Sequence, residues 1–236
     1  MAELCLPRAI SSSSELMFDV IGIEHLDEVV DFLMKYFFPV VPIGHIVNMD
    51  VEMEVRPWIR DFISAILNEG HTLSIRDPSE RNQLAAICVN QLEIQTTTPL
   101  VGVQILNSID HEKNPLMLMN ATFLEALGGD VDFFAKYSVE RVMDLTMMAV
   151  NPRYASQGLA TRLVELTVAR ARRQLNVTVW KTEAVSEYAA RALFKSGFQT
   201  IHEIPYDQFS YNGSKPLAPL AQSTHHKKGR LMVLTL

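Results

Sequence analysis

The sequence predicts a mixed α/β domain, and the second half of the chain carries the evidence. Residues 142–150 form a nearly continuous apolar run that ends at Asn151-Pro152, as is typical of a strand buried on both faces. Residues 159–173 follow with the apolar spacing of an amphipathic helix. Because strand and helix then continue to alternate, the order indicates an α/β fold. The later elements are expected over residues 177–180 (strand), 187–196 (helix), 198–204 (strand) and 231–236 (strand).

The first half of the chain adds helices and a hairpin. Apolar residues at helical spacing predict two helices, separated by a loop that contains Pro39 and Pro42. The expected elements are a strand over 18–21, helices over 25–36 and 56–67, a hairpin of strands over 72–75 and 84–92, a β-like run over 100–106, and a helical stretch over 116–137 that is interrupted at Gly128-Gly129.

Composition and charge limit the classes of partner. The chain has 236 residues, of which 48% are hydrophobic, enough for one substantial core. A flexible tail is expected over residues 1–14, followed by a single domain over residues 15–236. The net charge of −6 and the pI of about 5.6 argue against nucleic acid as the main partner, and they are compatible with an amine substrate.

Hydropathy and cysteine content predict a soluble, cytoplasmic protein. No apolar run reaches the roughly 18 residues needed to span a bilayer, and residues 1–10 lack the apolar stretch of a signal peptide. Cys5 and Cys88 are too few for a zinc cluster or a disulfide framework, so no metal is expected. Cys88 lies inside the apolar run 84–89 and is expected to be a buried thiol.

A strand, a short loop and a helix start over residues 147–160 predict a site for a phosphate group. Gly158 and Ala160 carry no bulky side chain, so a ligand can approach the backbone closely. Free N–H groups at a helix start and the helix dipole favour a pyrophosphate. The dipole contributes about 0.3–1 kcal/mol at a surface, so other contacts must supply most of the binding energy. The alternative is an ordinary strand–turn–helix that binds nothing.

The same loop carries a pattern found in one acyltransferase superfamily. In the GNAT superfamily an Arg or Gln, two residues, Gly, one residue and then Gly or Ala directly follow a central strand. Gly158 and Ala160 match, whereas the Arg or Gln position falls on Ala155, with Arg153 and Gln157 close by. This part of the chain therefore resembles the GNAT superfamily.

Residues 186–198 strengthen that resemblance, because they are similar to the superfamily helix that ends in Gly-Phe, here Gly197-Phe198. The gap from Gly158 to Gly197 suits one strand and two helices. The resemblance implies the GNAT acyl-CoA N-acyltransferase fold, with a central mixed sheet and one splayed pair of parallel strands.

A looser resemblance, over residues 18–236, is to the invertebrate arylalkylamine N-acetyltransferases. It rests on Tyr36-Phe37-Phe38 before a proline loop, the strand exit at 150–154, the region of Tyr188, and His226 before the last strand. It implies that acetyl-CoA lies between the strands at 142–150 and 177–180. The implied cofactor-binding residues are Met148, Ala149 and Val150 for the pantetheine, Ser156, Gln157, Gly158, Leu159, Ala160 and Thr161 for the pyrophosphate, and Ser186, Arg191 and Lys195.

The catalytic residues of the insect enzymes are largely missing from this sequence. The resemblance places their glutamate base on Val41 and two of their serines on Val185 and Ala189, while the neighbouring Ser186 is kept. The tyrosine acid of other superfamily members falls on Leu193. The proton of the substrate amine must therefore leave by another route.

Asp144 is the candidate acid/base group that would replace the missing glutamate, serines and tyrosine. Two strand histidines relay the proton in the vertebrate arylalkylamine enzymes, and the matching positions are Asp144 and Thr146. These two share one face of the strand if side chains alternate. Burial should raise the pKa of Asp144 toward a useful range. The alternative is a structural aspartate near the strand end that pairs with a base such as Arg141 or caps a turn.

Other candidates carry weaker signals. Tyr188 is expected to line the acetyl group or to donate to the thiol sulfur; the alternative is that it packs on its helix. Arg191 and Lys195, one helical turn apart, either meet the CoA phosphates or are exposed charges. The remaining acid/base candidates lie on the loop expected at the substrate side: Glu52, Glu54 and His45.

The sequence thus predicts direct transfer of acetyl from acetyl-CoA to a small primary amine, either an arylalkylamine or a polyamine-like compound, in a ternary complex. One alternative is an enzyme that uses a longer acyl-CoA or an amino-acid acceptor. The other is a CoA-binding homologue with weak catalysis, as the missing glutamate and serines allow. A monomer or weak homodimer is expected, without nucleic-acid or membrane partners.

Overall fold

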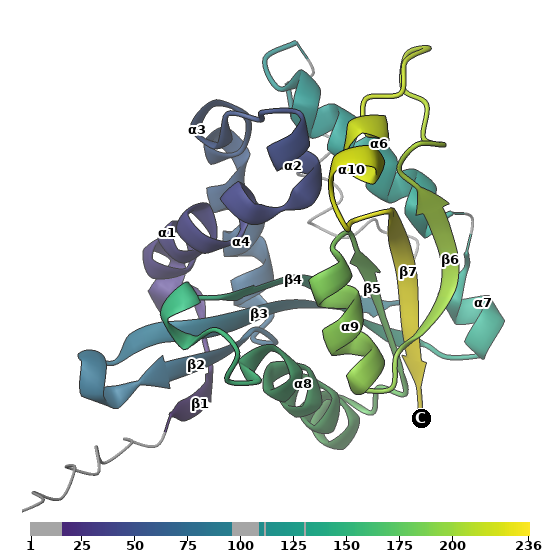
Figure 1. The fold of residues 1–236 in the computed structure, drawn as a ribbon. Helices are drawn as coiled ribbons and strands as arrows, with labels where there is room; N and C mark the ends of the chain where they lie inside the picture. The colour runs from purple at the N-terminus through teal and green to yellow at the C-terminus, as the bar shows by residue number, and fades with distance from the viewer. Residues whose placement is uncertain (1–15, 96–108, 111, 130) are drawn as a thin grey trace, which may run out of the picture.

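A computed structural model describes the chain except for residues 1–15, 96–108, 111 and 130. Seven strands of the described part form one sheet (Figure 1). They are β1 (Met17–Val20), β2 (Leu73–Asp77), β3 (Gln83–Ile94), β4 (Arg141–Val150), β5 (Val179–Ala184), β6 (Gln199–Pro205) and β7 (Lys228–Thr235). Their order is β1-β2-β3-β4-β5-β7-β6, and neighbours are antiparallel except for the parallel pair β4 and β5. The predicted mixed sheet with one parallel pair is confirmed.

Helices cover both faces of this sheet. The described helices are α1 (Leu26–Tyr36), α2 (Pro42–Ile46), α3 (Val51–Glu54), α4 (Arg56–Asn68), α6 (Pro115–Gly128), α7 (Phe133–Tyr137), α8 (Leu159–Leu175), α9 (Glu187–Lys195) and α10 (Ala218–Ser223). Single 3-10 turns lie at Ile23–His25, Phe38–Val40, Pro78–Glu80 and Pro152–Tyr154. Helix α8 packs on β2, β3 and β4, whereas α4 packs on β3 and α6 packs on β5, β6 and β7.

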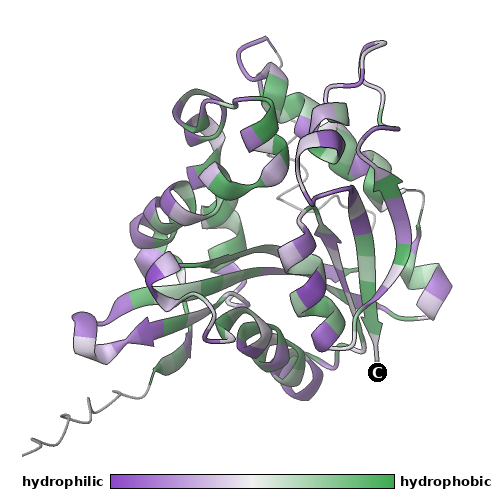
Figure 2. Cartoon of the chain, in the orientation of Figure 1, coloured by the Kyte–Doolittle hydropathy of each residue, from purple (hydrophilic) through white to green (hydrophobic). Residues whose placement is uncertain are grey.

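Three apolar clusters fill the space between helices and sheet. One lies under α8 and α9, with Trp180 fully buried in it. The second joins α1 and α4 to the sheet through residues such as Leu33 and Ile63. The third lies under α6, around Phe123 and Tyr206. Figure 2 shows hydrophobic residues along the central strands and hydrophilic residues on the outward faces of α1 and α8, as burial of one helix face requires.

Most of the predicted elements are present, and the differences have local causes. Strand β5 continues four residues beyond Trp180 because buried Thr182 and Ala184 alternate with Lys181 and Glu183. The proline loop contains the short helices α2 and α3, and α10 is a further short helix that the periodicity did not predict. The β-like run at 100–106 and the tail at 1–14 lie outside the described residues.

Two further expectations concern cysteine and the membrane. Cys88 is a free, fully buried thiol, as predicted, and burial raises its pKa to about 12. Cys5 lies outside the described residues. In the part of the chain that the structure describes, no helix combines the length and the apolar character needed to cross a bilayer.

Strand β4 contains an irregularity that matters for the site. Leu145 is paired with Asn90 and Met147 with Val89, so Thr146 is an extra residue with no partner of its own on β3. Such a bulge bends the strand and shifts the phase of its side chains. Accordingly Leu145 packs into the cluster under α8, whereas Met147 packs against the cluster of α1 and α4. The simple alternation expected along this strand ends at the bulge.

Candidate functional site

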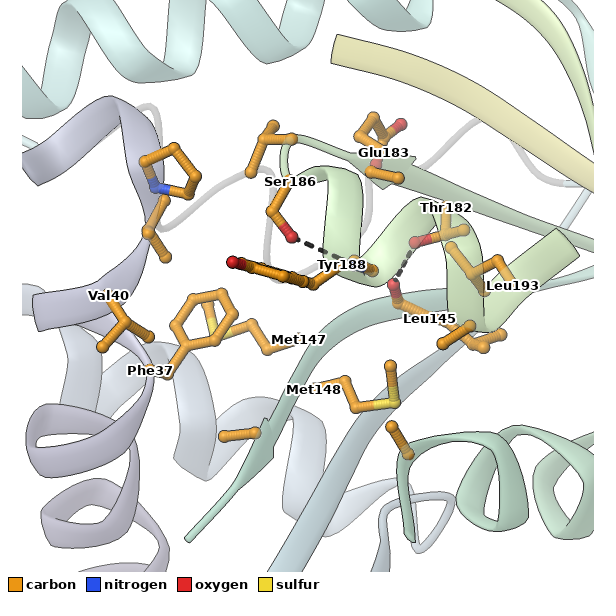
Figure 3. A pocket seen from close by; sticks show the side chains of 18 of the residues that line it. Phe37, Val40, Leu145, Met147, Met148, Thr182, Glu183, Ser186, Tyr188 and Leu193 are labelled. Carbon is orange, nitrogen blue, oxygen red and sulfur yellow. Dashed lines mark hydrogen bonds between the residues drawn. The ribbon is translucent and has the colours of Figure 1, made fainter. Parts of the chain in front are cut away.

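The parallel strands β4 and β5 pair at two positions and then separate. The pairs are Met143 with Trp180 and Asp144 with Lys181. A cavity of about 360 Å³ lies beyond them, between the two diverging strands (Figure 3). The cavity wall consists of Tyr36, Phe37, Val40, Val41, Pro42, residues 145–150, Ala160, residues 182–186, Tyr188, Ala189, Ala192, Leu193 and His226. The predicted splayed strand pair is thus present, and it frames a cavity.

One hydrogen bond closes the narrow end of this wedge. The Thr182 hydroxyl donates to the carbonyl oxygen of Leu145 across the gap, at 2.8 Å. Beyond Leu145, the edge of β4 that faces β5 has no strand partner among the described residues. Backbone N–H and C=O groups at such an edge can bind an extended ligand as an added strand.

The residues predicted to hold the pantetheine lie along that open edge. Met148, Ala149 and Val150 all line the cavity. Val150 pairs with Ala86 and Ala149 with Ile87 on β3, so the opposite edge of β4 faces the cavity. The structure therefore brings the three residues to one wall of the wedge.

The residues predicted to hold the pyrophosphate form the turn that starts α8. Ser156 and Gly158 have left-handed backbone conformations, with φ of 62° and 76°, and Gly158 is the N-cap of the helix. Gly158 has no heavy atom within 4 Å of the place where a Cβ would lie. Ser156 and Gln157 are exposed, Leu159 is buried in the core under α8, and Ala160 lines the cavity. Thr161 is half-buried on the first turn of α8.

A buried hydrogen bond fixes the loop that leads into this turn. The Tyr154 hydroxyl donates to Asp77 Oδ2 at 2.9 Å, and Tyr154 is 5% exposed. The neighbouring Arg153 pairs with Glu80, also from the β2–β3 hairpin. Ala155, at the position of the superfamily Arg or Gln, is exposed. Arg153, which was expected to lie near the phosphate loop, is therefore engaged by the hairpin.

Ser186 and Tyr188 enter the cavity from the start of α9. The Ser186 Oγ accepts a hydrogen bond from the N–H of Ala189 at 3.0 Å and so caps the helix, which leaves its own hydrogen free to donate. Tyr188 is 65% exposed, so it is not a core residue. Figure 3 shows its ring extending across the cavity toward Phe37 and Val40.

His226 lies beside Tyr188 in the cavity wall. Its ring centroid is 5.5 Å from that of Tyr188, and Nδ1 accepts a hydrogen bond from the N–H of Glu187 at 3.1 Å. Burial and the neighbouring His225 lower the pKa of His226. The imidazole is therefore neutral near pH 7, with its proton on Nε2.

Arg191 and Lys195 do not reach the cavity wall. Both side chains are exposed on α9, and Arg191 pairs with Glu187 at 3.8 Å. Lys195, on the last turn, has no ion pair among the described residues. Of the two cations predicted to contact the CoA phosphates, Lys195 is therefore the one that no described carboxylate engages.

Asp144 lies behind the cavity wall and does not line it. Its side chain is 13% exposed, its Oδ2 is 4.0 Å from the Lys181 Nζ, and its Oδ1 has no hydrogen-bond partner among the described residues. Burial raises the pKa of Asp144 well above its usual range, with Lys181 acting in the opposite direction. The basic partner is thus Lys181, whereas Arg141 donates to the carbonyl of Leu175. The proposed acid/base role of Asp144 stays a prediction.

The loop candidates are also outside the cavity wall. Glu52 is exposed and pairs with Arg56. Glu54 is buried and accepts a hydrogen bond from the N–H of Met117 at 3.1 Å, which ties α3 to α6. His45 is exposed on α2. Val41 does line the cavity, so the position of the insect glutamate is apolar here.

Among the cavity residues that the sequence reasoning missed, Thr182 and Glu183 are the two with polar side chains. Both follow the predicted end of the strand at Trp180, where two charged residues interrupt the apolar run. The signal that could have found them is the alternation of Lys181 and Glu183 with buried neighbours. Thr146 was noted only as the partner of Asp144, yet it lines the cavity and its buried Oγ1 has no hydrogen-bond partner in the described chain.

Comparisons with known proteins agree with this geometry. Residues 103–198 match the model of a family described as the Acetyltransferase (GNAT) family. None of the curated proteins compared with this sequence matches it. Among solved structures the fold is similar to arylalkylamine N-acetyltransferase 2 from Aedes aegypti, with a TM-score of 0.78 at 20% identity over 94% of this chain and 99% of that one.

Two other structures share the fold. The Drosophila melanogaster polyamine N-acetyltransferase, described as forming N-acetylagmatine, has a TM-score of 0.67 at 16% identity, over 94% of this chain and 100% of that one. Arabidopsis thaliana NAA60, solved in complex with acetyl-CoA, has a TM-score of 0.55 at 12% identity, over 94% of this chain and 99% of that one. Identities this low establish a shared fold and nothing further.

Proposed function

Residues 103–198 of this chain match the GNAT acetyltransferase family, and on that premise we propose that the chain transfers acetyl from acetyl-CoA to a small primary amine with an apolar body. The predicted superfamily, its fold and the N-acetyltransferase class are confirmed by the family match and the sheet topology. The observation that carries the proposal is the cavity between β4 and β5, where an open strand edge meets the start of a helix.

Acetyl-CoA fits this cavity from the side of α8 and α9. The pantetheine would hydrogen-bond to the open edge at Met148, Ala149 and Val150, as an added strand does. The pyrophosphate would lie at the α8 N-terminus, where the left-handed turn of Ser156 and Gly158 exposes backbone N–H groups. The thioester would then lie deep in the wedge, because the open edge leads toward its narrow end.

The opposite wall suits the acceptor amine. Phe37, Val40, Val41 and Met147 make it apolar, and Glu183 is the one acidic side chain among the described lining residues. A single carboxylate matches one ammonium group, whereas a polyamine would bury a second charge without a partner. The lining therefore favours an arylalkylamine or another monoamine over a polyamine.

The chemistry is attack of the neutral amine on the thioester carbon. Negative charge develops on the carbonyl oxygen and then on the leaving sulfur, and hydrogen-bond donors stabilise both. Ser186 and Tyr188 line the cavity and carry hydroxyl hydrogens, so we assign these donor roles to them. We retain Asp144 as a candidate proton acceptor, which would have to act through water since its side chain does not line the cavity.

The test is release of free thiol from acetyl-CoA with a panel of primary amines, together with calorimetry of acetyl-CoA binding. We expect binding in the low micromolar range or tighter, and turnover with arylalkylamines above that with agmatine or spermidine. Turnover confined to longer acyl-CoAs or to glycine would favour an acyltransferase of another specificity. Binding without turnover would indicate a homologue with weak catalysis, and no binding would refute the proposal.

Replacing Gly158 with valine is expected to weaken acetyl-CoA binding at least tenfold. The φ of 76° is unfavourable for a β-branched residue, and the side chain would occupy the open space through which the pyrophosphate approaches the backbone. Gly213→Val is the matched control, because Gly213 has a φ of 75°, is also unobstructed, and lies between β6 and α10 and not at the start of α8. If both variants bind acetyl-CoA equally well by calorimetry, the phosphate does not lie at this turn.

A further inference from the structure

A row of charged side chains leads from the cavity wall into the sheet. Glu93, Asp144 and Lys181 lie on the adjacent strands β3, β4 and β5, and their side chains are only 13%, 13% and 17% exposed. The Lys181 Nζ is 2.7 Å from Glu93 Oε1 and 4.0 Å from Asp144 Oδ2. Glu183 lies two residues beyond Lys181, hence on the same face of β5, and it lines the cavity.

This row contains three carboxylates, those of Glu93, Asp144 and Glu183, and one cation, Lys181. Lys181 forms its shortest ion pair with Glu93, so its positive charge stabilises the carboxylates of Asp144 and Glu183 less fully. Buried charges are costly unless they are paired. Burial raises the pKa of both Asp144 and Glu183, against the attraction of Lys181. A second cation beside Glu183 would therefore be stabilised.

Lys181 is the cation that acts on the Glu183 carboxylate among the described residues. Gly128 of α6 lies close to this carboxylate, because a Cβ built on it would be 3.9 Å from Glu183 Oε1. As a glycine it places no side chain there. The charged groups on its own face of the sheet include Lys181, Asp144 and Glu93, and the titratable His202 of β6 lies beside the end of α6, with its Nδ1 2.9 Å from the Leu127 carbonyl oxygen. Across the cavity the described titratable groups are Tyr36, Tyr188 and the neutral His226, so no resident cation competes there.

Two buried polar atoms on β4 support a hydrated route for a proton. Thr146 Oγ1 lines the cavity wall and Asp144 Oδ1 lies behind it, and neither has a hydrogen-bond partner among the described residues. Buried polar groups of this kind are usually satisfied by water or by a ligand. Thr146 Oγ1 is therefore a place in the cavity wall where a water molecule would be satisfied.

On the basis of the proposed function, we infer that Glu183 receives the ammonium group of the substrate and accepts its proton before acetyl transfer. The R–NH₃⁺ group gives one proton to the Glu183 carboxylate, and the freed lone pair attacks the thioester carbon. The C–S bond then breaks, the thiolate takes the second proton of the nitrogen, and the amide and CoA-SH leave. Glu183 finally releases its proton to water. Overall, the amine cation and acetyl-CoA are converted to the amide, CoA-SH and H⁺.

The test compares Glu183→Gln with native protein, using 2-phenylethylamine as the acceptor. Glutamine keeps the shape and cannot take the proton, so kcat/KM at pH 7.5 should fall by about 10²–10⁴-fold. The loss should shrink as the pH rises, because the free amine becomes more abundant. It should also shrink to within tenfold with the β,β-difluoro analogue, whose less basic nitrogen is already largely neutral. Acetyl-CoA affinity should stay within threefold of native.

Two variants serve as comparisons. Glu203→Gln makes the same change at an exposed carboxylate that pairs with Lys228 on β6 and β7, and it should leave kcat/KM unchanged. Asp144→Asn tests the other candidate acceptor, and its loss in kcat/KM should be smaller than that of Glu183→Gln because Asp144 does not line the cavity. Thermal unfolding of each variant checks that it is folded.

The outcomes separate the inference from the proposed function. If the native protein turns over and Glu183→Gln stays within threefold of it at pH 7.5, the inference is wrong. A large loss in Asp144→Asn with none in Glu183→Gln would assign the proton to Asp144 through water. If the native protein releases no thiol with any amine, the proposed function fails first, and the role of Glu183 fails with it.

Discussion

Replacing Lys181 with methionine is expected to lower the free energy of unfolding by about 3–5 kcal/mol at neutral pH, because it leaves buried carboxylates without their cation. Burial alone would lower the pKa of Lys181, but Asp144, Glu93 and Glu183 together raise it above its usual range. The ammonium is thus held in the charged state by its surroundings. Its loss exposes the carboxylates to the full cost of burial.

The destabilisation should depend on pH in a defined direction. Without Lys181 the pKa values of Asp144 and Glu183, already raised by burial, rise further in the folded protein. The folded state then binds more protons than the unfolded chain, so stability is highest below the unfolded pKa values of about 4 and is lost as the pH rises through the folded values. Urea unfolding of Lys181→Met should therefore show a smaller deficit at pH 5 than at pH 7.5.

Lys228→Met is the control for this experiment. The Lys228 Nζ is also 2.7 Å from a glutamate oxygen, that of Glu203, but the two side chains are 31% and 43% exposed. An exposed pair contributes about 0–1 kcal/mol. The double variant Lys181→Met/Glu93→Gln should recover part of the loss, because it removes one unpaired charge. Equal effects of Lys181→Met and Lys228→Met would show that the row is hydrated and not buried.

Replacing Phe123 with alanine is expected to cost about 3–5 kcal/mol of stability. Phe123 is fully buried on α6, and its ring lies 5.4 Å from that of Tyr206 and 5.1 Å from that of Phe209. It also packs on Gly229 of β7, where a Cβ would come within 2.8 Å of the ring. The contact therefore sets how closely α6 approaches the sheet.

The contact between ring and glycine gives a second measurement. Gly229→Ala alone should cost about 1–3 kcal/mol, because the added methyl group overpacks this contact. In the Phe123→Ala background the same change should cost less, since the ring is gone, although Leu127 is also within 2.9 Å of that Cβ position. Phe194→Ala, at a side chain that is 46% exposed, is the control with a small expected effect. Strict additivity in urea unfolding would contradict this packing.

The sequence by itself determined most of the secondary structure and the place of the turn that starts α8. Strand β4 and helix α8 were predictable because their apolar patterns are long and are closed by Asn151-Pro152 and by the Gly158 turn. Cys88 was predictable as a buried thiol for the same reason. Patterns of this kind depend only on neighbours in the chain, so a sequence displays them directly.

The tertiary structure decided which of the candidate residues share a cavity. The bulge at Thr146 places the open edge of β4, and it becomes visible only through pairing with β3. Glu183 was missed because the strand was expected to end at Trp180, while Asp144 was placed on the correct strand but lies behind the cavity wall. Strand register and the divergence of two parallel strands arise from contacts between residues far apart in sequence. Local periodicity carries no information about those contacts, and they determine which carboxylate lines the cavity.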